Sequence, residues 1–211
     1  MVAAVEMDAT DAESNAVVSV GEHIRVVVRV RPLNKAEKAK GDEACVRASA
    51  SGKEVQIKVG PLEAQVYRCN QCFKRETSQR SFFVDSGITD LLDSAIGGYR
   101  ACAFAFGQTG AGKTYTMVGQ SNTISQGSED DGLLGRSLEY LYSKLAAKGI
   151  TATLRLSSLE IYHEHVYDLF ADERERSSLP VREHSTDGFF LEGCKLVTCS
   201  SYPIACAELS R

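Results

Sequence analysis

The residues whose types and spacing most clearly indicate chemistry lie in the sequence GQTGAGKT, between Gly107 and Thr114. This run fits the pattern G-x-x-x-x-G-K-[ST], in which a glycine-rich turn points main-chain N–H groups at phosphate oxygens. Gly107 and Gly112 leave room for the backbone to approach an anion. Lys113 would bring a positive charge to the β- and γ-phosphates, and Thr114 would offer its hydroxyl to Mg²⁺. The motif predicts a phosphate site made of Gly107, Gln108, Thr109, Gly110, Ala111, Gly112, Lys113 and Thr114.

A phosphate-binding loop needs a strand that enters it and a helix that leaves it. Residues 100–106 (RACAFAF) are apolar and short, and we expect them to form a buried strand that runs into the loop. The chain after Gly112 is expected to be helical. A second buried strand is predicted over residues 24–30, which Pro32 would end because proline cannot donate to a sheet.

Other segments follow from the period of their apolar residues. Helices are predicted between residues 77 and 95 and over 133–147, and strands over 54–59, 65–73 and 151–167, with short strands between 181 and 199. Residues 35–43 and 121–132 are charged or rich in glycine, and we expect loops there.

Composition excludes several classes of protein. The 211 residues carry 24 Lys and Arg against 28 Asp and Glu, so the chain has no basic footprint for nucleic acid. No apolar stretch is long enough to insert into a membrane. Residues 1–22 are small, polar and acidic; without the basic start and apolar run of a secretory signal, they are expected to be a disordered lead-in in a cytoplasmic protein. Residues 23–211 are expected to be one domain.

Seven cysteines, an odd number without regular spacing, favour reduced thiols. Cys69 and Cys72 form a CxxC pair, which can indicate zinc or redox chemistry. Their segment reads as extended, and side chains three apart on a strand point to opposite faces, so we expect the two sulfurs to diverge and to be structural. His163 and His165 also lack an evident third ligand, and we expect no metal there.

The residues on either side of this loop resemble the sequence of a known protein family. The run from Ala103 to Met117 (AFAFGQTGAGKTYTM) resembles the signature of kinesins, and three more blocks occur in the kinesin order. These are RVRPLN at 29–34, SLEIYHE at 158–164 followed by DL at 168–169, and LPVRE at 179–183 followed by FLEG at 190–193. Gly135, Arg100 and the pair Cys69-Asn70 depart from the usual family residues.

This resemblance implies an α/β fold of the P-loop NTPase type: a three-layer sandwich around a central mixed, mainly parallel sheet, truncated on its C-terminal side. It implies that ATP and Mg²⁺ are the cofactors, with Thr114 as metal ligand and Lys113 and Thr114 as the catalytic residues. Arg29, Pro32 and Tyr115 would line the adenine. Microtubules would be the partner, with residues 179–193 contacting tubulin, at the cytoskeleton in the cytoplasm.

The resemblance leaves two functions open. Kinesins sense the γ-phosphate through an N-x-x-S-S-R-S-H block and a D-L-A-G-S-E block, and neither occurs in these 211 residues. The first function is the ATP-binding part of a motor that couples ATP hydrolysis to movement along microtubules. The second is a non-hydrolysing nucleotide-binding or scaffold protein derived from a kinesin. Other phosphate-loop classes rank last because no N-K-x-D or L-S-G-G-Q element occurs, and a region for oligomerisation is not expected in this chain.

Overall fold

The structure is a computed structural model that describes residues 2–9, 24–121, 124–150, 152–172, 174, 177–186 and 188–210. These residues belong to two compact units, and each is described by itself. Unit 1 comprises Met1–Glu13 with Thr123–Arg211, and unit 2 comprises Ser14–Asn122.

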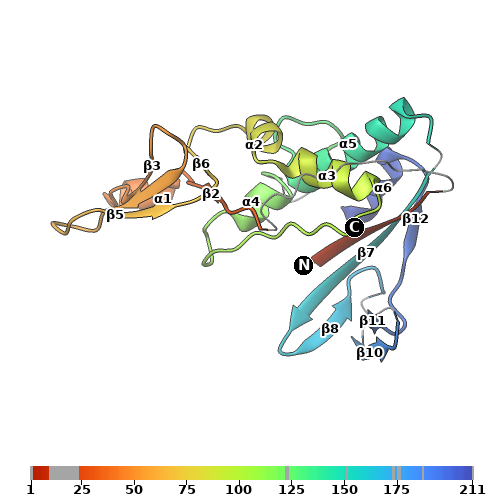
Figure 1. The fold of residues 1–211 in the computed structure, drawn as a ribbon. Helices are drawn as coiled ribbons and strands as arrows, with labels where there is room; N and C mark the ends of the chain where they lie inside the picture. Colours follow the sequence, from red (N-terminus) through yellow and green to blue (C-terminus); the bar gives the residue numbers. More distant parts are fainter. Residues whose placement is uncertain are drawn as a thin grey trace. The chain divides into compact units, whose positions relative to one another are not determined.

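Unit 2 contains small sheets and short helices (Figure 1). Its elements are β2 (Val27–Arg29), α1 (Lys35–Ala39), β3 (Val46–Ala48), β4 (Glu54–Ile57), β5 (Gln65–Arg68), β6 (Gln71–Phe73), α2 (Gln79–Asp85), α3 (Ile88–Ile96) and α4 (Lys113–Met117). Strand β2 pairs with β6 in parallel, and β3, β4 and β5 form an antiparallel meander. Val30, Val55 and Cys72 form a buried cluster between these strands.

Most predicted elements of unit 2 are present, but several are divided. The strand predicted over 65–73 is split into β5 and β6, and the helix predicted between 77 and 95 is split into α2 and α3. Gly87 separates the helices with φ of 86°, and the Arg25 side chain lies where a β-carbon on Gly87 would stand. The prediction of a loop over 35–43 is wrong, because Asn34 caps the short helix α1.

The prediction of a buried strand over 100–106 is also wrong. This segment is not assigned to a strand, and Phe104 and Phe106 are 81% and 95% exposed. A strand is stabilised by hydrogen bonds to a neighbour, and the ladders of the described residues do not include this segment. Among the described strands, β2 and β6 are the one parallel pair.

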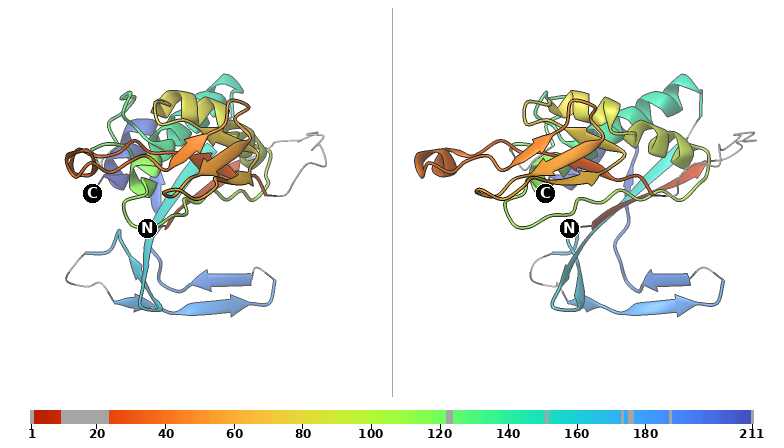
Figure 2. Two further views of the ribbon diagram at one scale, coloured as in Figure 1. Left: turned by 90° about the vertical axis from the view of Figure 1, so that its left-hand side faces the viewer. Right: turned by 60° about the vertical axis from the view of Figure 1, so that its left-hand side comes forward.

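Unit 1 is built around a long strand. Its elements are β1 (Val2–Ala9), α5 (Leu133–Ala147), β7 (Ala152–Tyr162), β8 (His165–Asp168), β9 (Ser178–Leu179), β10 (Val181–His184), β11 (Gly188–Leu191), β12 (Val197–Cys199) and α6 (Tyr202–Leu209). Strand β7 pairs antiparallel with β1, β8 and β12. Figure 2 shows β8 folded back on β7 and β10 with β11 as a separate ribbon.

Helices α5 and α6 cover the core of unit 1. Leu138, Leu141 and Leu145 recur at helical spacing along α5 and are buried, as the sequence predicts. Leu138 packs with Leu156 of β7 and with a set of smaller side chains, and all members of this cluster are almost completely buried. Burial of these apolar groups is the main term that holds unit 1 together.

The predicted lead-in over residues 1–22 falls mostly outside the described residues. Its described part, Val2–Ala9, pairs with β7 in register from Leu159 to Ala152 and is thus a strand. The proposed boundary between residues 22 and 23, and the single domain over 23–211, stay predictions. Among the described residues, no helix has the length and apolar character needed to cross a membrane.

Candidate phosphate and base site

The loop over residues 107–112 has the backbone that its glycines allow. Gly107, Gly110 and Gly112 have φ values of 152°, 81° and 98°, which side-chain-bearing residues rarely adopt. A β-carbon on Gly107 would lie 3.0 Å from the Ala111 β-carbon, so the turn closes on itself only with glycine there. The Ala111 N–H donates to the Gln108 carbonyl at 3.1 Å. The loop is thus a closed turn that ends where α4 begins.

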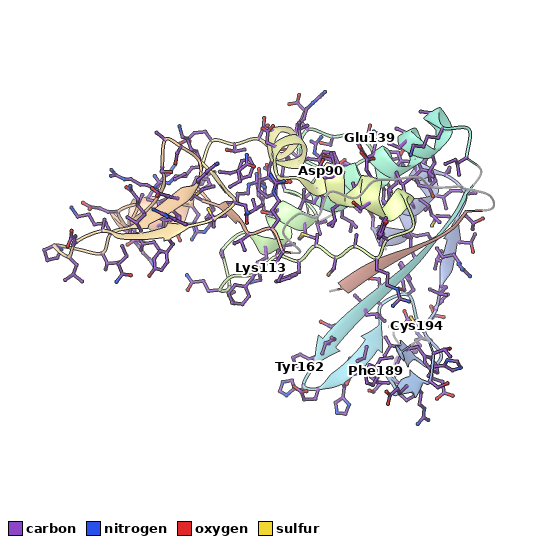
Figure 3. The ribbon with its side chains drawn as sticks, viewed as in Figure 1. Asp90, Lys113, Glu139, Tyr162, Phe189 and Cys194 are labelled. Atoms are coloured by element: carbon purple, nitrogen blue, oxygen red, sulfur yellow. The ribbon has the colours of Figure 1, made fainter. Side chains whose placement is uncertain are left out.

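The Lys113 side chain folds back over this turn (Figure 3). Its Nζ donates to the Gly107 carbonyl at 2.7 Å and to the Gln108 carbonyl at 3.0 Å. The ammonium group therefore lies at the mouth of the loop, where an oxyanion bound by the loop would need a positive charge. Thr114 follows on the first turn of α4 and is exposed.

Arg29 connects three elements beside the loop. Its Nη1 donates to Gln79 Oε1 at 2.7 Å and to Thr116 Oγ1 at 3.3 Å, and its Nη2 donates to the Thr77 carbonyl at 3.2 Å. Its guanidinium carbon lies 5.0 Å from the centre of the Tyr115 ring. The structure thus brings Arg29 of β2 against α4 and the start of α2.

Aromatic rings surround the Arg29 guanidinium. Its central carbon also lies 4.6 Å from the centre of the Phe82 ring, which packs edge-on against Phe73 at 4.8 Å. Burial lowers the pKa of Arg29, and Tyr115 opposes that shift. Contacts between a guanidinium and two ring faces stabilise the charge where hydration is partly lost. Gln79 Nε2 donates to the Tyr115 carbonyl at 2.6 Å and fixes the backbone of the same residue.

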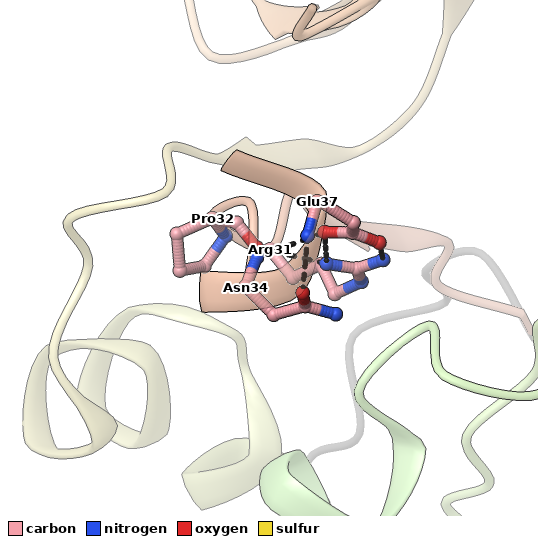
Figure 4. Close-up of polar contacts among 4 residues, drawn as sticks. All are labelled: Arg31, Pro32, Asn34 and Glu37. Carbon is pink, nitrogen blue, oxygen red and sulfur yellow. Dashed lines mark hydrogen bonds and ion pairs between the residues drawn. The ribbon is translucent and has the colours of Figure 1, made fainter. Parts of the chain in front are cut away.

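Arg31 and Glu37 form the edge of the site on the side of α1 (Figure 4). Arg31 Nη1 donates to Glu37 Oε2 at 2.7 Å, and Nη2 pairs with Oε1. The hydrogen bond from Arg31, followed by that from the Asn34 N–H, lowers the pKa of Glu37 to about 2. A β-carbon on Gly112 would be 3.9 Å from the Arg31 β-carbon, so this ion pair lies beside the end of the loop.

The predicted site residues occupy two groups in unit 2. Residues 107–115 form one continuous piece, and Arg29 contacts it through Tyr115 and Thr116. Pro32 is exposed, and its carbonyl accepts from Arg31 Nη1 at 2.9 Å, so its predicted place against adenine stays a prediction. The supporting residues Thr77, Gln79, Phe82 and Thr116 are not among those that the sequence predicts for the site. Gln79 carried a usable signal, since it begins a helix just after the capping residue Ser78.

The sequence predicts a metal ion at Thr114 and none at His163 and His165. No group of three or more His, Cys, Asp or Glu side chains that could hold a metal ion occurs among the described residues. Thr114 as a Mg²⁺ ligand stays a prediction.

Together these features define a class, a protein with a phosphate-binding-loop motif on an α/β fold. Comparison with protein families matches residues 29–210 to the kinesin motor domain. The chain therefore belongs to the kinesin motor-domain family. This confirms the resemblance seen in the sequence.

Individual relatives agree with this assignment. Kinesin-like protein KIF11 of Mus musculus is 32% identical over 189 residues, covering 84% of this chain and 18% of that protein. Kinesin-like protein KIN-14C of Arabidopsis thaliana is 36% identical over 178 residues, covering 81% of this chain and 22% of that protein. The solved structure of a fast kinesin superposes with a TM-score of 0.77 at 29% identity, over 87% of this chain and 50% of that one. The chain thus spans about a fifth of the length of these curated relatives and half of the length of the solved motor. The structural match confirms its α/β motor fold.

Proposed function

We propose that this chain is the ATP-binding part of a microtubule-based motor and that residues 107–115 hold ATP with Mg²⁺. The observation that carries the proposal is the closed turn over 107–112 with the Lys113 ammonium group at its mouth. A turn of glycines, an ammonium group and a neighbouring hydroxyl form a donor set that fits a polyphosphate and its cation.

Each residue then has a defined part. The main-chain N–H groups of residues 107–112 other than that of Ala111, which donates to the Gln108 carbonyl, would bind phosphate oxygens, and Lys113 would move from the loop carbonyls to these oxygens. The exposed Thr114 hydroxyl serves as a ligand to Mg²⁺, which screens the negative charge of the phosphates. Tyr115 is 40% exposed and would offer its ring to the adenine. Arg29 is already engaged by Phe82 and Gln79, so we assign it the positioning of Tyr115 in place of direct stacking on the base.

Microtubules are the proposed partner, at the cytoskeleton in the cytoplasm. Membership of the kinesin family supports this, and the solved fast kinesin is described with an ATPase mechanism and interactions with microtubules. The ribbon of β10 and β11 is the proposed contact with tubulin. Val181 and Phe189 are 56% and 76% exposed on it, and Arg182 pairs with Glu192 at 2.9 Å.

Replacing Lys113 with Ala tests the proposal. We expect the affinity for a fluorescent ATP analogue with Mg²⁺ to fall at least about tenfold, because a hydrogen bond to a charged group contributes about 1.5–3 kcal/mol. Lys148→Ala, at the exposed end of α5, is the matched control and should bind as the wild type does. Unchanged affinity in a folded Lys113→Ala variant would contradict the phosphate site.

Turnover distinguishes the two functions that the sequence leaves open. ATP hydrolysis measured with and without microtubules in the same preparations assigns a motor ATPase when microtubules accelerate it. Binding of the analogue without turnover under both conditions assigns the non-hydrolysing alternative and leaves the phosphate site intact.

A further inference from the structure

Cys69 and Cys72 lie on either side of a bend in the chain, and this bend brings their backbones closer together. The chain bends at Asn70, between β5 and β6. The Cys69 N–H donates to the Lys53 carbonyl, and the Cys72 N–H donates to the Gly52 carbonyl. Adjacent residues have α-carbons about 3.8 Å apart, so these neighbouring acceptors draw the two cysteines together.

The cysteine side chains share the same surroundings. Cys72 is 6% exposed and belongs to the buried cluster with Val30 and Val55, against which the half-buried Cys69 packs. Burial, and then the neighbouring Cys69 thiol through its charge and a hydrogen bond, raise the pKa of Cys72 to about 11. The expectation that one extended segment carries both cysteines is therefore wrong. It assumed a continuous strand, and the bend at Asn70 removes the alternation of faces.

Asn70 holds the bend in place. Its N–H donates to the Val26 carbonyl at 3.0 Å, and its Oδ1 accepts from the Val26 N–H at 2.7 Å. The bend is thus fixed from two sides, by Val26 ahead of β2 and by the turn at Gly52 and Lys53. A fixed bend reduces the conformational freedom that two sulfurs lose when a bond joins them.

Zinc does not fit this pair. A structural zinc site uses four ligands, and the described residues offer no third or fourth His, Cys, Asp or Glu near the two sulfurs. A dithiol that exchanges with disulfides needs one accessible sulfur for attack and a second sulfur in contact with it. Cys69 is the half-buried thiol of the pair, and it packs against the buried cluster that contains Cys72.

We propose that Cys69 and Cys72 form a reversible dithiol–disulfide pair that reacts with small disulfides of the glutathione class. The Cys69 thiolate attacks one sulfur of the oxidant, forming a mixed disulfide and releasing one glutathione thiolate. Cys72 then loses its proton to water, and its sulfur displaces the second glutathione thiolate from Cys69. Two protein thiols are oxidised to one disulfide, and one glutathione disulfide is reduced to two thiols. This modification site is independent of the proposed ATP site.

The order of attack follows from exposure. The oxidant reaches the half-buried Cys69 before Cys72, whose raised pKa also leaves little thiolate at neutral pH. Once Cys69 carries glutathione, Cys72 attacks within one bend of the chain, which is faster than attack by a second molecule. An S–S bond of about 2 Å requires the two sulfurs to approach each other across this single bend.

The test uses the full chain in glutathione buffers with a rising fraction of the disulfide form. Samples are acid-quenched, alkylated and cut with trypsin, which cleaves after Arg68 and Lys74 and so releases these two cysteines alone on one short peptide. As the fraction of glutathione disulfide rises, we expect this peptide to change from a form with two alkyl groups to a form with none. The latter has two hydrogens fewer than the dithiol. A peptide that keeps both alkyl groups at every ratio, or that ends with glutathione on Cys69, would overturn the proposal.

Cysteine variants separate the two steps. In Cys72→Ser the second attack is removed, and we expect glutathione to accumulate on Cys69 at least about tenfold above its level in the wild type. Cys45→Ser, which removes an exposed thiol elsewhere in unit 2, should leave the 69–74 peptide unchanged. Equal glutathione on Cys69 in Cys72→Ser and in the wild type would overturn the assignment of Cys72. If Cys72→Ser does not fold, the 69–74 peptide of the wild type still shows whether the disulfide forms.

Discussion

Arg29 has a structural role beside the proposed binding site. The kinesin resemblance places it against adenine, whereas the structure directs its donors to Thr77, Gln79 and Thr116. Its guanidinium also contacts the Tyr115 ring. Because these donors are engaged by the protein, the role that we propose for Arg29 is to position Tyr115.

We expect Arg29→Lys to lower the free energy of unfolding by roughly 2 kcal/mol. Lysine keeps the charge but cannot reproduce the planar fork and its contact with the rings. Urea unfolding followed by tyrosine fluorescence measures the change, and Arg68→Lys, at a side chain that is 90% exposed, is the control. Equal stability of the two variants would show that the Arg29 contacts contribute little.

Glu37 provides a pH signature. Its pKa in the folded chain is about 2, below its ordinary value of 4.5, because Arg31 and the Asn34 N–H stabilise the carboxylate. Its contribution to stability is thus complete above pH 4.5 and is lost as the pH falls through 2. A ¹³C NMR titration of the Glu37 carboxyl should show the low midpoint, and Arg31→Gln should raise it. A midpoint near 4.5 in the wild type would contradict the ion pair.

Among the elements, α5 contains a glycine whose presence is explained by a close packing contact. Gly135 lies inside the first part of α5, and a β-carbon there would be 2.8 Å from Ile124 Cγ2. Kinesins usually have another residue at this position, so the departure in the sequence corresponds to a real contact. Ile124 is 7% exposed, so its side chain is surrounded by other parts of the protein.

We therefore expect Gly135→Ala to destabilise the chain, although alanine is the better helix former. The gain in helix propensity is about 1 kcal/mol, whereas overpacking costs about 1–3 kcal/mol, so the net loss is about 1 kcal/mol. In an Ile124→Ala background the same change should be neutral or stabilising. Thermal unfolding of the four proteins in this cycle measures the coupling, and equal effects in both backgrounds would refute the contact.

The elements that the sequence predicted correctly are those with strong periodicity. The repeat of leucines along α5 specifies a buried face, and burial of that face is what forms the helix. Helix α1 was missed although its signal was present: Asn34 and Glu37 are spaced as a capping box, in which each side chain binds the other's N–H. The segment 100–106 failed for another reason, since composition predicts a strand and pairing depends on a neighbour that composition does not contain.

The same distinction between local signals and distant partners applies to the candidate site. The loop over 107–114 could be found from its sequence because glycine, lysine and threonine have local reasons for their positions. The Arg29 network could not, since Gln79 Oε1 and the Phe82 ring reach Arg29 from residues about fifty positions further along the chain. The shared surroundings of Cys69 and Cys72 depended on a bend that is held by hydrogen bonds to Val26 and to the turn at Gly52, which are again distant in sequence.

At the scale of the whole molecule, exposed aromatic side chains dominate the expected solution behaviour. Phe104 and Phe106 lie close together in the chain with their rings in solvent. Neighbouring exposed apolar groups favour association, whereas isolated ones are common on protein surfaces. Val84 on α2, which is 57% exposed, is such an isolated group.

We expect the 211-residue chain to bind the dye ANS, to self-associate and to unfold over a broad temperature range. The double variant Phe104→Ser with Phe106→Ser should reduce dye binding by more than half, and Val84→Thr should leave it unchanged. Dye fluorescence and sedimentation velocity provide the measurements. A cooperative melt with sharp near-ultraviolet signals in the wild type would contradict this view.

Strand β7 has a consequence for how unit 1 opens. Between Leu154 and Leu156 it is bonded to β1 on one edge and to β12 on the other, and both leucine side chains are at most 1% exposed. Fraying of the tip near Tyr162 or of the β10–β11 ribbon leaves these amides covered. Deuterium from the solvent reaches them only when the whole sheet comes apart, so their exchange rate reports the lifetime of the folded unit itself.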